Sequence, residues 1–271
     1  MTILAGVIGD PISHSRSPRL HGHWLARHAI DGQYMPLHVR SADLADALRL
    51  LPRLGFAGLN VTLPHKEAVF ALADEVSDRA RSVGAANTLT FRDERIIADN
   101  TDGFGFTANL AHRAPERDLT TPCLVLGAGG AARGVIAALL AEGTPAITLA
   151  NRSRERADAL AADFAGRVHV VDWESASGAL PGHGLLVNTT SLGMTGQPPL
   201  AMDLSRLDPD TVVTDIVYTP LETPLLRDAR VRGNTVVDGL GMLLHQAVPG
   251  FAAWFGITPD VDDALRIAVL R

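Results

Sequence analysis

Short runs of β-branched and aliphatic residues alternate with longer stretches of helical character along most of this chain. The runs typical of strands are residues 3–8, 34–39, 58–62, 87–91, 124–126, 146–150, 168–171, 185–188, 212–215 and 235–237. Stretches typical of helices lie between most of them, at residues 18–29, 42–54, 67–73 and 131–141. Because strands that alternate with helices form βαβ units, this pattern predicts an α/β fold with mainly parallel sheets.

A polar segment interrupts the pattern near the middle of the chain. Residues 111–122 are rich in charged and hydroxyl side chains and contain Pro115 and Pro122. A new strand, a glycine-rich turn and a helix follow this segment. The chain has 271 residues, enough for two domains of about 100–200 residues each. We therefore expect two α/β domains divided near residues 102–121, with a ligand cleft between them.

Composition narrows the class of protein. A net charge of −6 excludes a global basic field that would attract nucleic acid or an anionic membrane, and 46% hydrophobic residues exclude a disordered chain. No apolar run approaches the roughly 18 residues of a membrane span, and the first residues lack the features of a signal peptide. The single cysteine, Cys123, cannot form an internal disulfide, which fits a reducing compartment, so we expect a cytoplasmic protein. We also expect no nucleic-acid, membrane or metal partner.

A glycine-rich turn follows the strand expected at 124–126. Gly127, Gly129 and Ala132 match the G-x-G-x-x-G/A pattern of dinucleotide-binding domains. The first glycine permits the turn, the second lets the backbone approach a pyrophosphate, and the small third residue lets helix and strand pack closely. The helix N-terminus then offers free N–H groups to the phosphates. A purely structural turn remains the alternative.

The residues after the next strand bear on the cofactor. NAD sites usually place an acidic residue there for the ribose 2′-OH, whereas this chain has Asn151, Arg152 and Arg156. Guanidinium groups bind a 2′-phosphate that a carboxylate would repel. We expect both arginines to face one side of the first helical turns, because they are four residues apart. The pattern favours NADP; the alternative is a solvated basic helix face with Glu155 as partner.

Polar side chains cluster at expected strand ends in the first hundred residues. Serines occupy a turn at positions 13 and 15, and further polar groups occur at residues 60–66, 87–88 and 99–103. In an open α/β sheet, the carboxyl ends of the strands face the ligand crevice. Each residue also has a structural explanation: Ser13 and Ser15 could stabilise their turn, and Asp102 could cap the next helix.

One basic residue differs from all the others. Of the 24 basic residues, 23 are Arg and one, Lys66, is Lys. Arg stays protonated in proteins, whereas Lys can give up a proton, so a site that needs a proton-exchanging amine cannot accept Arg. Pro64 predicts that Lys66 lies in the first turn of a helix, where the helix dipole disfavours a cation. A chance survivor among surface residues is the other interpretation.

Several blocks of this sequence closely resemble shikimate dehydrogenases. They are residues 9–18, 55–66, 84–88, 100–103, 127–131, 151–153, 215–218, 223–226 and 239–243, together with Gln246. They run in order over nearly the whole chain. Gly22 departs from the pattern, because Asn is expected there, and this puts one supporting contact in doubt. The resemblance implies NADPH-dependent reduction of 3-dehydroshikimate to shikimate, a step of aromatic amino-acid (chorismate) biosynthesis.

The resemblance also implies roles for particular residues. Lys66 and Asp102 would form the catalytic pair, and Ser13 and Ser15 would hold the substrate carboxylate. The remaining substrate contacts would be Thr62, Asn87, Gln246 and Tyr218. The cofactor contacts would be Gly127, Ala128, Gly129, Gly130, Ala131, Asn151, Arg152, Arg156, Thr190, Gly239 and Met242.

The implied organisation joins the two ends of the chain. Residues 1–102 and 240–271 would form the substrate-binding domain, and residues 103–239 a Rossmann-type NADP-binding domain, in a monomer or homodimer. Three rival functions remain. They are an NAD-dependent quinate/shikimate dehydrogenase, an NADP dehydrogenase for a folate or malic-type acid, and a shikimate sensor without activity. The sensor would be expected to lack Lys66 or Asp102, and both are present.

Overall fold

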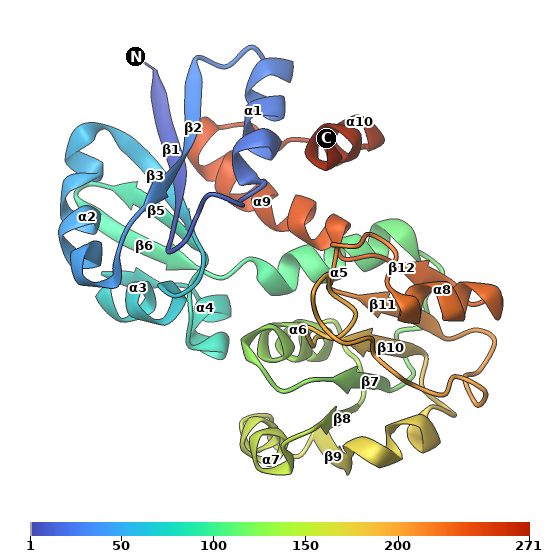
Figure 1. Ribbon diagram of the computed structural model, residues 1–271. Coiled ribbons are helices and arrows are strands. Elements are labelled where there is room, and N and C mark those ends of the chain that lie inside the picture. The colour runs from blue at the N-terminus through green and yellow to red at the C-terminus, as the bar shows by residue number, and fades with distance from the viewer. Residues whose placement is uncertain (1) are drawn as a thin grey trace. The chain divides into compact units, whose positions relative to one another are not determined.

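A computed structural model describes residues 2–271 and divides the chain into two compact units (Figure 1). Unit 1 consists of Met1–Thr101 together with Leu244–Arg271, and unit 2 is Asp102–Leu243. Unit 1 is therefore built from both ends of the chain. Within residues 2–271, no helix is long and apolar enough to cross a membrane.

The strands and helices alternate as the sequence pattern predicts. The strands are β1 Ile3–Gly9, β2 Gly32–His38, β3 Phe56–Val61, β4 Glu75–Val76, β5 Thr88–Arg92, β6 Arg95–Asp99, β7 Cys123–Leu126, β8 Ile147–Asn151, β9 Val168–Asp172, β10 Leu185–Asn188, β11 Val212–Asp215 and β12 Val236–Val237. The α-helices are α1 Ser17–Arg27, α2 Leu44–Leu50, α3 Lys66–Leu72, α4 Asp78–Val83, α5 Asp102–Arg113, α6 Gly130–Ala141, α7 Arg154–Ala162, α8 Pro224–Val231, α9 Leu240–Phe255 and α10 Asp263–Leu270. Short 3-10 helices flank α2, and another, η3, spans Trp173–Ala179.

The sheet of unit 1 is mixed: the expected parallel pairings form three of its five strand pairs, and the other two are antiparallel. Its strand order is β2-β1-β3-β5-β6-β4, and β5 runs antiparallel to both β3 and β6. The antiparallel pairing of β5 with β6 follows from the tight turn at Asp93 and Glu94 that joins these two strands. Both of these turn residues adopt positive φ, as the two central residues of a type I′ hairpin turn do.

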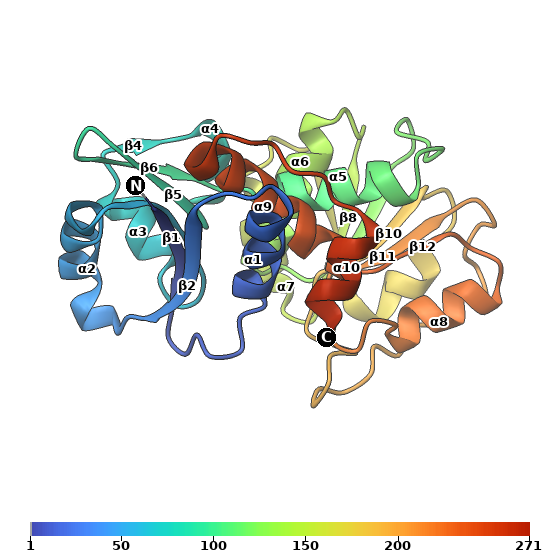
Figure 2. The same ribbon diagram turned by 90° about the horizontal axis from the view of Figure 1, so that it is seen from above.

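Apolar side chains cover both faces of this sheet. Buried residues of α2, α3 and α4 form one cluster with the strands, with Leu48, Val69 and Ala80 among them. Figure 2 shows α1 and α9 together on the other face. There Trp24 of α1 and Phe251 of α9 pack with ring centroids 5.1 Å apart. The C-terminal helices thus complete the core of unit 1.

The sheet of unit 2 is entirely parallel. Its order is β12-β11-β10-β7-β8-β9, which in chain order within the unit reads 6-5-4-1-2-3. This is the Rossmann strand order, in which the connections reverse direction between β7 and β10. Ligands of such sheets bind at the carboxyl ends of the strands beside that reversal.

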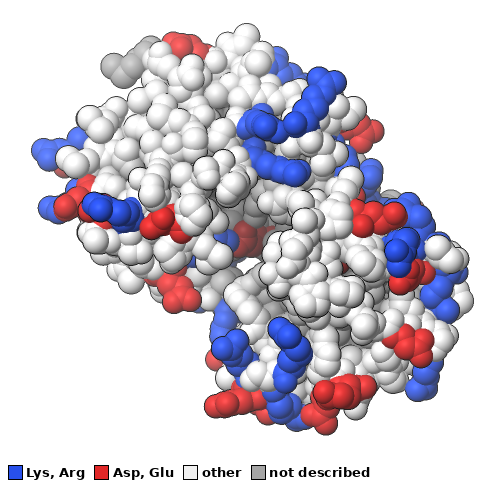
Figure 3. Space-filling model, in the orientation of Figure 1, with Lys and Arg blue, Asp and Glu red and all other residues white. Residues whose placement is uncertain are grey.

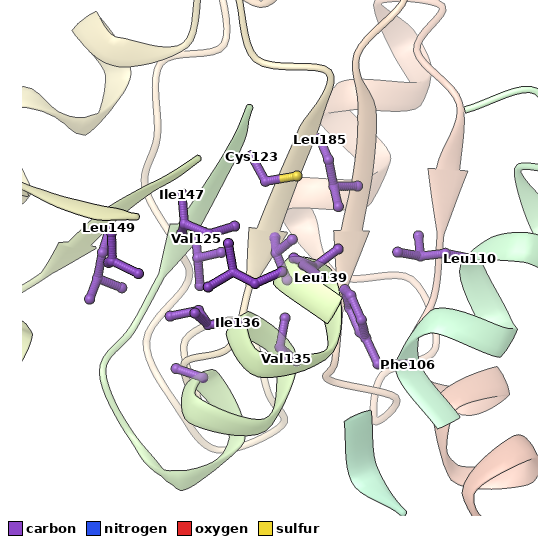
Figure 4. Close-up of a cluster of buried hydrophobic side chains, with 14 of the residues drawn as sticks. Phe106, Leu110, Cys123, Val125, Val135, Ile136, Leu139, Ile147, Leu149 and Leu185 are labelled. Atoms are coloured by element: carbon purple, nitrogen blue, oxygen red, sulfur yellow. The ribbon is translucent and has the colours of Figure 1, made fainter. Parts of the chain in front are cut away.

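Helices cover both faces of the parallel sheet, so its strands are buried on each side. Alternate residues of β7 face opposite cores: Cys123 and Val125 join one cluster, and Leu124 and Leu126 the other. The first cluster contains side chains of α5, α6 and α7, several of which Figure 4 shows against the strands. The second contains residues of η3 and α8. This explains why the central strands are continuous apolar runs.

Candidate active site

The loops that follow β1 and β3 lie against each other in unit 1. The amide of Asp10 donates to the carbonyl of Leu63 over 3.1 Å, and the amide of Thr62 donates to the carbonyl of Ile8 over 2.9 Å. A Cβ at Gly9 would lie only 2.6 Å from the Thr62 methyl group, so this close approach requires glycine. The turn that carries Ser13 and Ser15 begins directly after this contact.

Ser13 and Ser15 differ in their exposure and in their hydrogen bonds within the turn. Ser13 is exposed, whereas Ser15 is half-buried and its hydroxyl accepts a hydrogen bond from the amide of Ser17 over 3.3 Å. Ser15 therefore contributes to the entry into α1, as one structural explanation anticipated. Both hydroxyls can also donate hydrogen bonds.

Lys66 is the first residue of α3, as Pro64 predicts. Its side chain is half-buried, and its carbonyl accepts a hydrogen bond from the amide of Ala86 over 2.9 Å. Lys66 is thereby held beside the residues that lead into β5. Asn87, the next residue in that segment, lies close to it in the same unit.

Asn87 is 5% exposed and is the centre of a hydrogen-bond network. Its Oδ1 accepts hydrogen bonds from the Thr101 amide at 2.9 Å, the Thr101 hydroxyl at 3.1 Å and the Thr88 hydroxyl at 3.0 Å. The orientation of the side-chain amide follows, because only the oxygen can accept these three bonds. Since β5 is antiparallel to β3, Asn87 stands at the amino end of its strand and still meets the carboxyl end of β3.

Asn60 and Tyr34 extend this network, and the sequence did not single them out as a pair. The Tyr34 hydroxyl donates to Oδ1 of Asn60 over 2.7 Å. Nδ2 of Asn60 donates to the Thr88 hydroxyl at 3.2 Å and to the carbonyl of Asn87 at 3.3 Å. Asn60 lies in a sequence block with a family resemblance, whereas nothing in the sequence signalled Tyr34.

Gln246 belongs to unit 1, on the first half of α9. Gly250 lies on the face of α9 that packs on the sheet, because a Cβ added at this position would be 3.3 Å from the Thr88 methyl group. Gln246 precedes Gly250 by four residues, so both lie on the same face of the helix. The half-buried Gln246 side chain therefore projects from the helix face that covers β5.

Unit 2 carries the other two residues expected to act on the substrate. Asp102 is the first residue of α5, and its side chain is half-buried. Tyr218 is half-buried in the loop that follows β11. Both side chains make interactions within the protein.

The glycine-rich turn has the geometry that a pyrophosphate needs. Gly127 has φ +105°, and a Cβ there would lie 2.7 Å from the Thr189 hydroxyl. At Gly129 and Gly130, in contrast, a Cβ would meet nothing within 4 Å. The N-terminus of α6, at Gly130, has no side-chain cap. Because N–H groups at a helix N-terminus bind phosphate, the residues present fit a dinucleotide phosphate.

Asn151 ties this turn to the loop after β8. Its Oδ1 accepts from the amide of Ala128 at 3.2 Å, and its Nδ2 donates to the carbonyl of Ser153 at 2.8 Å. Ala131, in the first turn of α6, directly follows the glycines. Thr190 lies in the loop after β10, and its methyl group would be 2.9 Å from a Cβ at Gly127. Asn151 and Thr190, two of the expected cofactor contacts, therefore both lie against the glycine-rich turn.

Gly239 and Met242 stand at the start of α9, within unit 2. A Cβ at Gly239 would lie 2.2 Å from the carbonyl oxygen of Ile216, so the close approach of this segment to the loop after β11 requires glycine. Met242 is half-buried and packs against the apolar cluster that contains side chains of α5 and α6.

The arginine segment differs from expectation in one respect. Helix α7 begins at Arg154 with Ser153 as its N-cap, so Arg152 lies before the helix and does not share its first turns with Arg156. The cap hydrogen bond from the amide of Arg156 to the Ser153 hydroxyl, 3.3 Å long, sets this boundary.

The arginines after β8 also differ in their partners. Arg154 pairs with Asp158 and Asp172, each at 2.9 Å. Within residues 2–271, no carboxylate pairs with Arg152 or Arg156, and Glu155 does not act as their partner. Both arginines are exposed. Figure 3 shows basic and acidic side chains interspersed on the surface of the protein. Two guanidinium groups thus remain for an external anion.

A Rossmann sheet with a glycine-rich turn at its reversal point, and with arginines after its second strand, defines a dinucleotide-binding protein of the NADP type. Three family models match the chain: the shikimate dehydrogenase substrate binding domain at residues 7–89, shikimate / quinate 5-dehydrogenase at 109–193, and the shikimate 5′-dehydrogenase C-terminal domain at 239–267. The chain belongs to the shikimate dehydrogenase family.

Individual relatives agree with this assignment. The chain is 60% identical over 269 residues to a "Shikimate dehydrogenase (NADP(+))" of Jannaschia sp. (strain CCS1), covering 98% of this chain and 97% of the relative. Among solved structures it is similar to shikimate 5-dehydrogenase of Thermus thermophilus in complex with NADP(H) and shikimate, with TM-score 0.88, 35% identity, and coverage of 100% and 99%. It is also similar to quinate dehydrogenase of Corynebacterium glutamicum in complex with NAD, with TM-score 0.92, 34% identity and 99% coverage of each chain.

Proposed function

We propose that this protein reduces 3-dehydroshikimate to shikimate with NADPH, and catalyses the reverse oxidation, in aromatic amino-acid (chorismate) biosynthesis. The observation that carries the proposal is the start of α3, where the carbonyl of Lys66, the only lysine of the chain, accepts a hydrogen bond from the amide of Ala86, the residue before Asn87. The NADP-dependent relative at 60% identity supports the same reaction.

The substrate would be held by residues of several elements. Ser13 and Ser15 present hydroxyl donors from one turn, which suits a carboxylate. The hydrogen bonds that Oδ1 of Asn87 accepts from Thr88 and Thr101 fix the orientation of its amide, and we assign Asn87 to a ring hydroxyl of the substrate. We assign the remaining contacts to Thr62, Tyr218 and Gln246, following the family resemblance.

When bound, NADPH supplies the hydride that reduces the substrate carbonyl. The ammonium group of Lys66 donates a hydrogen bond to the carbonyl oxygen, stabilises the negative charge that develops there and transfers a proton to it. Asp102 accepts a hydrogen bond from the hydroxyl that results and orients Lys66. In this scheme the pair performs general acid catalysis in reduction and general base catalysis in oxidation.

The phosphate-binding residues favour NADPH over NADH. We assign the pyrophosphate to Gly127, Ala128, Gly129, Gly130 and Ala131 at the N-terminus of α6. Asn151 shapes the adenosine side of this site, and Arg152 and Arg156 bind the 2′-phosphate. Thr190, Gly239 and Met242 would line the nicotinamide end.

A second candidate is NAD-dependent quinate/shikimate oxidation. It is favoured by the likeness to the quinate dehydrogenase in complex with NAD, which has the same fold. Against it stands Asn151, which occupies the strand end where an acidic residue would bind the ribose 2′-OH of NAD.

One set of assays separates the two candidates. Purified protein is given shikimate or quinate, each with NADP⁺ or NAD⁺, and initial rates are measured over a range of substrate concentrations. We expect the highest kcat/KM for shikimate with NADP⁺. A higher kcat/KM for quinate with NAD⁺ would contradict the proposal and support the second candidate.

We further propose that the enzyme acts in the cytoplasm as a monomer or homodimer, with the small-molecule substrate as its partner. Support for the reducing compartment comes from the single cysteine, Cys123, which is buried. Sedimentation equilibrium of the purified chain would give its mass in solution.

A further inference from the structure

Two neighbouring strands of the second sheet end in a fully buried amide–carboxylate pair. Strand β10 ends at Asn188 and β11 at Asp215, and the two residues are register partners with 0% of their surface exposed. Nδ2 of Asn188 donates to Oδ1 of Asp215 over 3.0 Å. The pair lies at the carboxyl ends of parallel strands, where such sheets bind ligands.

Asp215 holds the loop that follows its own strand. Its Oδ1 also accepts from the amide of Val217 at 2.9 Å, and its Oδ2 accepts from the Thr223 hydroxyl at 2.7 Å. Thr223 is the N-cap of α8, so one carboxylate fixes both ends of the loop at residues 216–223. Tyr218 lies within this loop, directly after Val217.

Asn188 holds the loop that follows β10 in the same way. Its Oδ1 accepts from the Thr190 amide at 3.0 Å and from the Thr190 hydroxyl at 2.7 Å. Its Nδ2 also donates to the carbonyl of Leu192 at 3.2 Å. The position of Thr190 therefore depends on Asn188, which in turn depends on Asp215.

All three hydrogen-bond partners of Asp215 are donors, which suits an ionised carboxylate. Burial raises the pKa of Asp215, and the three hydrogen bonds oppose this effect. Within residues 2–271 no basic side chain pairs with it. Burying such a charge is costly, and well-packed apolar residues would join two strands without that cost. The pair therefore does more than hold β10 and β11 together.

We propose that Asp215 and Asn188 are positioning residues, which fix the two loops that carry Tyr218 and Thr190. The inference rests on the proposed function, because it takes these two residues as contacts to substrate and cofactor. Asp215 acts on Tyr218 through the amide of Val217, and Asn188 acts directly on Thr190. Neither member of the pair touches the reacting atoms.

The first test needs no substrate. Amide hydrogen exchange is measured by NMR on the full chain and on Asp215→Asn, which keeps the side-chain volume but loses the charge and one acceptor. We expect the amide of Val217 to exchange roughly tenfold faster or more, because the acceptor of its hydrogen bond, Oδ1 of Asp215, is weakened. An unchanged rate at Val217 would overturn the proposal.

A matched pair of substitutions separates positioning from stability. Thr223 and Thr211 are each 1% exposed, and Thr211 donates to the carbonyl of His183 over 2.7 Å at the other end of β11. Thr223→Val and Thr211→Val each remove one buried hydroxyl. We expect both to lower Tm, and only Thr223→Val to lower kcat/KM for shikimate. Thr223→Ser, which keeps the hydroxyl, should restore it. Equal kinetic losses in the two Val variants would overturn the proposal.

A double-mutant cycle tests the route through Tyr218. Asp215→Asn should lower kcat/KM for shikimate about tenfold in the parent and much less in a Tyr218→Phe background, since Asp215 then has no hydroxyl to position. Additive losses would show a structural role and overturn the inference. A parent protein inactive with shikimate and NADP⁺ would contradict the proposed function instead, and the exchange rates would still decide whether the pair holds the loops.

Discussion

At the scale of single residues, hydrogen bonds decide which atoms remain for a ligand. Oδ1 of Asn87 accepts three bonds from Thr88 and Thr101, so this oxygen is taken up within the protein and the orientation of the amide is fixed. The same reasoning applies to the basic side chains after β8. Arg154 is taken up by Asp158 and Asp172, whereas Arg152 and Arg156 have no carboxylate partner within residues 2–271.

Replacing Arg152 by Ala should weaken NADPH specifically. The loss of one charge-assisted hydrogen bond to the 2′-phosphate should raise KM for NADPH about tenfold and leave KM for NADH nearly unchanged. Steady-state kinetics with both cofactors measure this. Arg154→Ala is the matched control, because that guanidinium is already paired, and it should affect neither cofactor strongly. Equal losses with both cofactors in Arg152→Ala would contradict the assignment.

Lys66→Arg should lose most of its activity although the positive charge is kept. Arg cannot release a proton in this pH range, and general acid–base assistance typically contributes about 10²–10⁴-fold. We expect kcat to fall by at least about 10²-fold while NADPH titration of the variant gives the parent's dissociation constant. A variant that turns over at a rate close to the parent's would show that charge alone suffices.

His21 should make the stability of the protein sensitive to mild acid. Burial lowers its pKa to about 3, and its ring is stacked on Tyr34 at 3.9 Å. The unfolded chain binds this proton near pH 6.5, so stability is lost as pH falls from there toward the folded pKa. In that window each pH unit costs about 1.4 kcal/mol.

His21→Phe should therefore flatten the decline of the unfolding free energy between about pH 6 and pH 4, as measured by urea unfolding. Phe251→Leu is the control, since it loses buried packing in the same aromatic cluster without removing a titrating group. It should lower stability about equally at each pH. An unchanged pH dependence in His21→Phe would show that the folded protein protonates His21 at the same pH as the unfolded chain, and would contradict the lowered pKa.

At the scale of elements, the packing of α9 on the first sheet depends on glycine. A Cβ at Gly58 in β3 would lie 1.9 Å from Nε1 of Trp254 and 2.2 Å from the carbonyl oxygen of Leu89. Trp254 itself donates to that carbonyl over 3.0 Å. The helix that carries Gln246 therefore approaches the strands only because position 58 has no side chain.

Gly58→Ala should destabilise the protein by about 1–3 kcal/mol, because backbone and indole must both move. Gly22→Ala is the contrasting substitution. A Cβ at this exposed position in the middle of α1 would meet nothing within 4 Å, so Ala should stabilise the helix by about 0.5–1 kcal/mol. Urea unfolding of both variants measures the two changes. Gly58→Ala as stable as the parent would refute the close packing of α9.

Local signals predicted some elements and not others. Pro64 correctly predicted that Lys66 lies in the first turn of a helix, and the glycine pattern located the turn between β7 and α6. Strands β4 and β6 were missed because charged residues interrupt their apolar pattern: β4 begins at Glu75, and β6 begins at Arg95 and ends at Asp99. Arg152 was placed in a helix that begins two residues later, because the capping role of Ser153 went unrecognised.

At the scale of the whole molecule, the chain builds unit 1 from its two ends and unit 2 from its middle. Periodicity cannot predict that Leu244–Arg271 joins the first hundred residues, and the family resemblance alone supplied that expectation. The bonds of Tyr34 and Asn188 were not predictable for the same reason. Their partners, Asn60 and Asp215, are 26 and 27 residues away on other strands of the same sheets.

The most direct test of the proposed function follows the hydride. Purified protein is incubated with 3-dehydroshikimate and NADPH that carries deuterium at the transferable position of the nicotinamide, and the product is analysed by mass spectrometry. We predict shikimate with one deuterium per molecule, formed by the parent and hardly at all by Lys66→Arg. Absence of shikimate, or shikimate without deuterium, would contradict the assignment of this chain as an NADPH-dependent shikimate dehydrogenase.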